Sequence, residues 1–235
     1  MLAEFALAAS TQAPKVIRHL DFHFGISVQT TDTNHTSGIG NGPISGVANS
    51  TASGSTEGTI AVDVVGLRAD GGLVVNVLEN SREIPHPDTA QCITWGVGTV
   101  VCEPGKHTTP EEQALLRYMG RHFVNPSMID AKNHWSVGTN GKDESETSDY
   151  RITCNDSGIM CISFERVTKM PGVQGFSATT DGKMVYDSNL TVPREISEDT
   201  MLRTSLVNGS IVQGGYEQVH TMVNIELLDD SMASH

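Results

Sequence analysis

Most of the common signatures of function are missing from this chain of 235 residues, and each absence excludes a class of protein. Lys and Arg total 15 against 28 Asp and Glu, which gives a formal net charge of −13 at pH 7. Such a chain repels phosphate backbones and anionic lipid surfaces, so we expect it to bind neither nucleic acid nor a membrane surface. Since no run of about eighteen apolar residues is present, the sequence also predicts that it is not an integral membrane protein.

Motifs of catalysis and metal binding are missing as well. The chain contains no G-x-S-x-G elbow, no phosphate-binding loop and no H-E-x-x-H helix. A tract that begins at Asp32 has the first oxygen ligands of a calcium loop, but Ser37 and Pro43 stand where glycine and glutamate are required. The sequence therefore indicates no catalytic residue, no metal and no cofactor.

The four cysteines form two local pairs. Cys92 falls opposite Cys102 across a three-residue turn, and Cys154 falls opposite Cys161 if a two-residue turn joins their strands. Directly opposed residues of two antiparallel strands lie near the distance that a disulfide requires. Neither pair has the spacing of a zinc knuckle, so two disulfides are favoured over a zinc site or free thiols, although other pairings stay open. Disulfides predict an oxidising compartment, extracellular or periplasmic.

Alternation of apolar and polar side chains predicts strands along most of the chain. In residues 16–30, Leu20, Phe22 and Phe24 share an apolar face, whereas His19, Asp21 and His23 share a polar one. We expect the polar face to be a solvated surface, or to form a polar cluster with a neighbouring strand. About ten to twelve strands are expected in all. Tight hairpin turns are predicted at Asp70-Gly71, Asp181-Gly182 and Asn208-Gly209.

One helix is predicted, over residues 109–124. Thr109 is its expected N-cap, Pro110 the first helical residue, and Glu112 completes a capping box. Its apolar stripe consists of Leu115, Leu116, Met119, His122 and Phe123.

The remaining segments define the expected domain organisation. Residues 1–15 are predicted to be a flexible tail or a signal-peptide remnant, and residues 229–235 a second tail. Residues 31–58 are rich in Gly, Ser and Thr and lack periodicity, so they are predicted to be a long polar loop. Because no change in composition marks a boundary, residues 16–228 are predicted to form a single antiparallel β domain.

The balance of helix and strand predicts the architecture. A helix over 109–124 spans roughly 24 Å and cannot cover the apolar face of a flat sheet of ten strands. We therefore predict one large antiparallel meander sheet, strongly curved like a half-barrel or barrel, with the helix on its apolar face. A β-sandwich is the alternative.

Three functional hypotheses follow. The first is a non-catalytic secreted or cell-envelope protein that binds a lipid, an acyl chain or another apolar small molecule inside the curved sheet. The second is a structural or adhesive envelope subunit without a small ligand, which self-associates through a sheet edge or through its N-terminal segment. An enzyme of the hydrolase type is the least favoured. The first hypothesis predicts a cavity lined by Phe22, Phe24, Val62, Leu116, Met119 and Val223.

Overall fold

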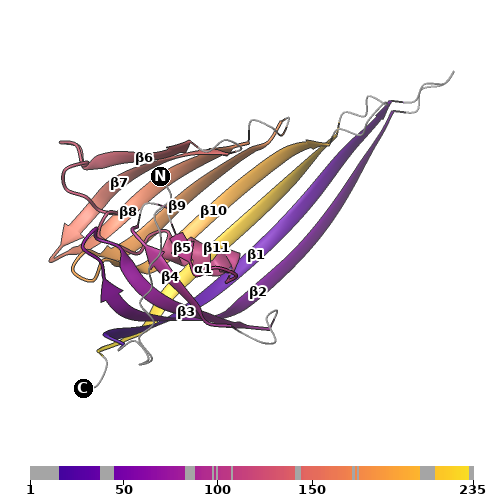
Figure 1. Cartoon of the computed structure of the whole chain (residues 1–235). Helices are drawn as coiled ribbons and strands as arrows, with labels where there is room; N and C mark the ends of the chain where they lie inside the picture. Colours follow the sequence, from indigo (N-terminus) through magenta and orange to yellow (C-terminus); the bar gives the residue numbers. More distant parts are fainter. Residues whose placement is uncertain are drawn as a thin grey trace.

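The computed structural model describes residues 16–37, 45–82, 88–96, 98, 100–106, 108–140, 144–170, 173, 175–206 and 215–232. Within them, one antiparallel sheet of eleven strands has the order β5-β4-β3-β2-β1-β11-β10-β9-β8-β7-β6 (Figure 1). This confirms the predicted single sheet; it is not closed, and no second sheet packs on it within the described residues. The strands are β1 (Arg18–Ser37), β2 (Ser45–Leu67), β3 (Leu73–Ser81), β4 (Ala90–Thr94), β5 (Val100–Cys102), β6 (His134–Asn140), β7 (Ser145–Asp156), β8 (Ile159–Lys169), β9 (Ser177–Asp187), β10 (Val192–Leu206) and β11 (Gly215–Met232).

The chain builds this sheet as two meanders that meet in the middle of the sheet and reach opposite edges. Strands β1 to β5 run outward from the middle of the sheet to one edge. The chain then crosses to the opposite edge, and strands β6 to β11 run back to the middle, where β11 pairs with β1. Residues 103–133 make this crossing and contain the helix α1 (Pro110–Leu116). We call them the crossing segment.

The crossing segment shows that the sheet curves around it. The backbone N–H of His122 donates to the carbonyl of Trp95, which directly follows β4, over 3.0 Å. The next residue, Phe123, has its ring centroid 5.9 Å from that of Trp135 on β6. In a flat sheet β4 and β6 would be roughly 43 Å apart, because nine intervals of about 4.8 Å separate them. Figure 1 shows α1 inside the resulting hollow.

The predicted N-terminus of the helix is confirmed, but its predicted C-terminus is wrong. The Thr109 side chain accepts a hydrogen bond from the Glu112 N–H, and the Thr109 N–H donates to the Glu112 carboxylate, both over 3.0 Å. The helix nevertheless ends at Leu116 instead of residue 124. Gly120 has φ +133°, which no helical residue adopts. Beyond it the predicted apolar stripe breaks, and His122 is exposed.

Both predicted disulfides are present, in the predicted registers. Cys92 pairs with Cys102 on β4 and β5, and Cys154 with Cys161 on β7 and β8. The turn between β7 and β8 has two residues, Ser157-Gly158, both with positive φ. These two bonds fit an oxidising compartment.

The turn predicted at Asp181-Gly182 is wrong, because β9 runs straight through both residues. Gly182 lies opposite Phe164 of β8, and a Cβ atom at Gly182 would stand 2.1 Å from the Phe164 ring. The glycine therefore makes room for an aromatic ring instead of reversing the chain. The turn predicted at Asp70-Gly71 does join β2 to β3.

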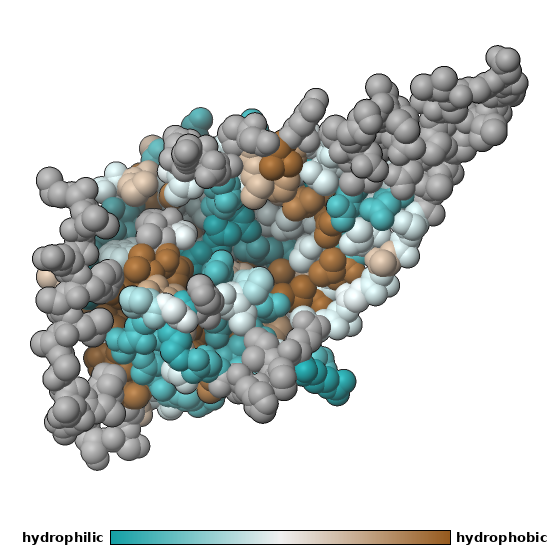
Figure 2. Space-filling model, turned by 45° about the vertical axis from the view of Figure 1, so that its right-hand side comes forward, coloured by the Kyte–Doolittle hydropathy of each residue, from teal (hydrophilic) through white to brown (hydrophobic). Residues whose placement is uncertain are grey.

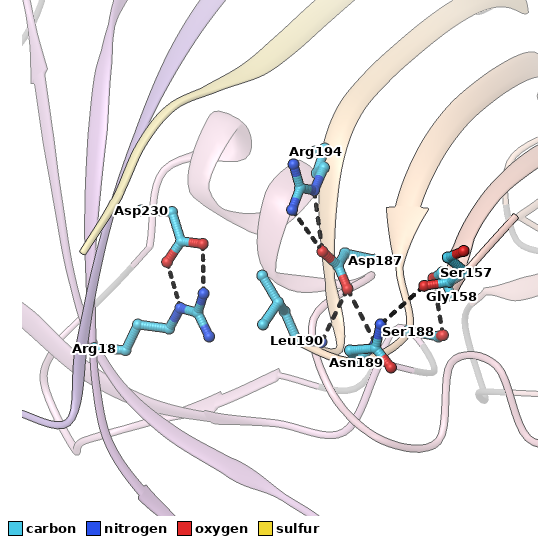
Figure 3. Close-up of polar contacts among 9 residues, drawn as sticks. All are labelled: Arg18, Ser157, Gly158, Asp187, Ser188, Asn189, Leu190, Arg194 and Asp230. Carbon is cyan, nitrogen blue, oxygen red and sulfur yellow. Dashed lines mark hydrogen bonds and ion pairs between the residues drawn. The ribbon is translucent and has the colours of Figure 1, made fainter. Parts of the chain in front are cut away.

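The chain reverses six residues later, between β9 and β10. The buried Asp187 carboxylate accepts hydrogen bonds from the backbone N–H groups of Asn189 and Leu190, over 3.0 and 3.2 Å. Its second oxygen accepts from the Arg194 guanidinium over 2.7 Å (Figure 3). The Ser188 N–H donates to the Gly158 carbonyl, which joins this turn to the turn between β7 and β8. A side chain rather than a glycine thus holds the reversal.

The prediction of a polar loop over residues 31–58 is wrong. β1 extends to Ser37, and β2 begins at Ser45 and pairs with β1 without a register shift. Ladder hydrogen bonds need no apolar side chains, so a tract rich in Ser and Thr forms strands where a partner strand is available. β11 likewise continues past residue 228 to Met232. Residues 1–15 and Asn208-Gly209 lie outside the described residues.

Candidate functional site

The six side chains predicted to line a cavity come together in the core. Phe22, Phe24 and Val223 lie on the central strands β1 and β11, and Val62 lies on the adjacent β2. Leu116 and Met119 reach them from the crossing segment. All six are buried members of one hydrophobic cluster. Their burial in one core is observed, whereas a ligand cavity among them stays a prediction.

A buried polar network borders this cluster at Tyr118, Arg166 and Glu198. The Tyr118 hydroxyl donates to one oxygen of Glu198 over 2.6 Å and accepts from the Arg166 guanidinium over 2.9 Å. A second guanidinium nitrogen donates to the other Glu198 oxygen over 2.7 Å. The Arg166 and Glu198 side chains are only 6% and 5% exposed, so water does not replace these bonds.

Burial and the neighbouring charges together determine the pKa values of the network. Burial raises the pKa of Tyr118 well above its ordinary value, and the Glu198 carboxylate adds to the effect. Burial works to lower the pKa of Arg166, but Tyr118, Glu198 and Glu146 outweigh it and raise the pKa. Arg117 of the crossing segment holds the same Glu146 over 2.7 Å. Every charge of the network thus has an opposite charge beside it.

Sequence analysis did not predict this network, although the alternation of residues in β8 and β10 indicates it. Arg166 follows Ile162 and Phe164 at the inward positions of β8, and Glu198 follows Ile196 at the inward positions of β10. A charged residue in the apolar half of an alternating strand predicts a buried partner. Both oxygens of Glu198 are engaged, so the network has no group free to act as a general base; it fixes the crossing segment to the sheet.

Beyond the network, the inward face of the long central strands continues outward from the core. Val28 on β1, Val219 on β11 and Leu202 on β10 share the inward side of their strands with the core residues. They are half-buried, and they belong neither to the core cluster nor to the side chains packed against it. Thr200 and Thr221 lie between them. Figure 2 shows hydrophobic and polar residues side by side where the long strands leave the body of the protein. We call these five residues the inward strip.

The outer face of the sheet carries polar groups that do not form a catalytic triad. Ser136 donates to Asp149, and the nearest His134 nitrogen lies 3.6 Å from the same carboxylate. The carboxylate thus lies between serine and histidine, whereas in a Ser-His-Asp triad the imidazole lies between the other two groups. Among the described residues, no group of three or more His, Cys, Asp or Glu side chains is placed to hold a metal ion.

A buried carboxylate pair lies beneath the N-terminus of α1. Burial raises the pKa of Glu112, and the nearby Glu79 carboxylate adds to the effect. One Glu79 oxygen is buried without a hydrogen-bond partner in the described part of the chain. This arrangement favours protonation of Glu112 in the folded protein and supplies no cation ligand beyond the two carboxylates.

The polar cluster expected around His19 does form with a neighbouring strand. One ring nitrogen of His19 lies 2.6 Å from Asp63 of β2, and the other lies 3.1 Å from Asp21. The hydrogen bond with Asp63 is the main cause of a raised His19 pKa; burial opposes it, and Asp21 adds to it. The folded protein therefore holds this proton more tightly than the unfolded chain.

This cluster predicts a pH-dependent contribution to stability. The stabilisation is complete below the ordinary histidine pKa and is lost as the pH rises through the raised value. His19→Asn is expected to lower the free energy of unfolding by about 1 kcal/mol or less at pH 5.5, since solvent screens the pair, and by nearly nothing at pH 9. Urea unfolding at the two pH values measures this. His23→Asn, exposed on the same strand, is the control; a His19→Asn deficit equal at both pH values would contradict the prediction.

Within the described residues, no helix is long and apolar enough to cross a membrane. A scan against known protein families finds no matching family for this chain, and a search of curated proteins finds no match.

Proposed function

We propose that this is a non-catalytic binding protein that holds a lipid or acyl chain on the inward strip, in an extracellular or periplasmic compartment. The observation that carries the proposal is the continuation of the apolar inward face past the packed core. Val28, Val219 and Leu202 retain solvent contact there, although they stand in line with buried core residues of the same strands. A soluble protein that leaves such a face partly uncovered gains by binding an apolar ligand on it.

The dimensions and lining of the inward strip suit a hydrocarbon chain. Three adjacent strands contribute to it, so it is about 10 Å wide, and its two rows of residues, at Val28 and at Val219, lie about 7 Å apart along the strands. Gly54 and Ala52 of β2 lie opposite Val28 and Thr30, so one side of the strip has no bulky side chain. Threonine methyl groups add apolar surface without closing the strip.

The charges around the strip favour a neutral or cationic head group. Asp32 and Glu217 lie directly opposite each other on β1 and β11, at the outer end of the strip. Together with the net charge of −13, they repel an anionic head group. A neutral fluorescent probe is therefore the appropriate reporter.

Titration with the uncharged probe N-phenyl-1-naphthylamine tests the proposal. The wild-type protein is expected to bind it saturably, and Val219→Asp is expected to weaken binding about tenfold or more, because a carboxylate in the strip must be desolvated by the ligand. Asn224→Asp is the matched control, since it adds the same charge to the outward face of the same strand.

This control distinguishes loss of probe contact in the inward strip from the general effect of one added negative charge. Asn224→Asp is expected to bind the probe as the wild type does. Absence of saturable binding by the wild type, or equal weakening in both variants, would refute a ligand site on the inward strip.

A further inference from the structure

One edge of β2 has no pairing strand among the described residues over more than half of its length. β2 spans Ser45–Leu67, but β3 pairs only with Gly58–Leu67. Residues 45–57 pair with β1 on one side, and no described strand pairs with them on the other. Every second residue of this segment therefore directs its backbone N–H and C=O groups away from the sheet. We call residues 45–57 the free edge.

The free edge lacks the features that keep natural sheet edges apart. Such edges are usually short, bulged, or protected by lysine or proline. The outermost strand β5 follows this rule, since it has only three residues. The free edge has the sequence SGVANSTASGSTE, with one charge and no proline, and its pairing with β1 shows no bulge. It is long, regular and nearly neutral.

We propose that the free edge pairs antiparallel with the free edge of a second copy of this chain, about a two-fold axis at Thr51. The length of the free edge determines this register. At one end β3 already occupies the neighbouring position, because Ser81 pairs with Gly58. An incoming strand must therefore begin opposite Glu57. If Ser45 of the second copy lies there, both free edges pair over their full length and Thr51 faces its counterpart.

The charges agree with this register. A protein with a net charge of −13 resists self-association over most of its surface. In the proposed pairing Glu57 faces Ser45, and the two Glu57 residues are roughly 40 Å apart, so no like charges meet. The remaining pairs combine Gly, Ala, Val, Asn, Ser and Thr without a charge, and the Thr51 pair at the axis opposes two hydroxyl residues, an arrangement that stabilises antiparallel strands. The axis is perpendicular to the sheet, so both inward faces lie on the same side of the dimer.

The N-terminal segment of the same chain is a weaker candidate for pairing with the free edge. Near the start of the described structure, the N–H of Ile17 donates to the carbonyl of Val64, in the part of β2 that pairs with β3 on its other side. A segment that reached back along the free edge from there would run parallel to β2, and parallel pairing is slightly weaker per residue. The second copy offers the stronger antiparallel ladder.

Two like charges that face each other at the two-fold axis test the pairing. Sedimentation equilibrium from about 1 to 100 µM is expected to show a dimer for the wild type, and Thr51→Lys is expected to raise its dissociation constant about tenfold or more, because two ammonium groups then meet. Thr31→Lys is the matched control. It places the same charge on β1 directly beside Thr51, about 14 Å from its counterpart across the axis.

A mixing experiment identifies the axis. Thr51→Lys and Thr51→Glu copies, each weakened alone, are expected to form a heterodimer when mixed, because the charges then attract. Unchanged circular dichroism verifies the fold of each variant. A wild type that stays monomeric, equal effects of Thr51→Lys and Thr31→Lys, or a dimer that is lost only when residues 1–15 are deleted would each overturn the proposal.

Discussion

Arg166→Met is expected to lower the free energy of unfolding by about 3–5 kcal/mol, the size of effect found when one partner of a buried ion pair is removed. The guanidinium donates to both Tyr118 and Glu198, and the variant leaves the Glu198 carboxylate 5% exposed without its counter-charge. Denaturation in guanidinium chloride measures the loss. Arg151→Met, exposed on the adjacent β7, is expected to change stability by less than about 0.5 kcal/mol.

A second variant distinguishes the effect of the uncompensated Glu198 charge from the effect of lost packing around Arg166. Arg166→Met combined with Glu198→Leu removes both charges, and it is expected to recover most of the loss, because apolar residues of similar volume replace buried ion pairs well. A loss below about 1 kcal/mol would show that the network contributes little, and a double variant no more stable than the single one would show that lost packing, and not the uncompensated charge, causes the loss.

Gly120→Ala is expected to lower the free energy of unfolding by about 3 kcal/mol or more. Its φ of +133° is strained for any residue with a side chain. In addition, a Cβ atom there would stand 2.5 Å from the Trp95 carbonyl carbon and 2.8 Å from the Gly96 nitrogen. Both neighbours are backbone atoms and cannot rotate away, so the crossing segment must move off the sheet.

Gly105→Ala provides a control with the same type of backbone strain and no collision. Gly105 has φ +79°, and a Cβ atom added there would have no neighbour within 4 Å. It is expected to cost about 1 kcal/mol, the lower part of the range for strain alone. Thermal unfolding of both variants measures the difference. Equal losses would show that backbone conformation, and not the close approach to Trp95, makes Gly120 necessary.

The predictions for Arg166 and Gly120 both concern the attachment of the crossing segment to the sheet. The crossing segment must hold the two halves of an open sheet around itself. The Gly120 N–H donates to Thr191 beside β10, and its carbonyl accepts from Tyr186 of β9, while its Cα lies against Trp95. The network around Arg166 fixes the preceding residues. Loss of either connection exposes the core that the crossing segment covers.

The sequence by itself determined the features that depend on neighbouring residues. Cys92 and Cys102 could be paired because a tight turn sets the register of the strands that it joins. The capping box of Thr109 and Glu112 is likewise complete within four residues. Alternation identified the apolar face of β1, since side-chain direction reverses at each residue of a strand.

Only the tertiary structure decided the features that depend on residues far apart in the chain. Asp181-Gly182 has the composition of a turn, yet Phe164 on the adjacent strand requires the glycine for its ring. The helical pattern continues to residue 124, yet the helix ends at Leu116, whose carbonyl accepts a hydrogen bond from the Thr94 hydroxyl of β4. Residues 31–37 and 45–58 lack any local strand signal, and they form strands because β1, β2 and β11 pair with one another. The physical reason is common to all three: close approach and ladder pairing are properties of two segments, and neither segment alone encodes them.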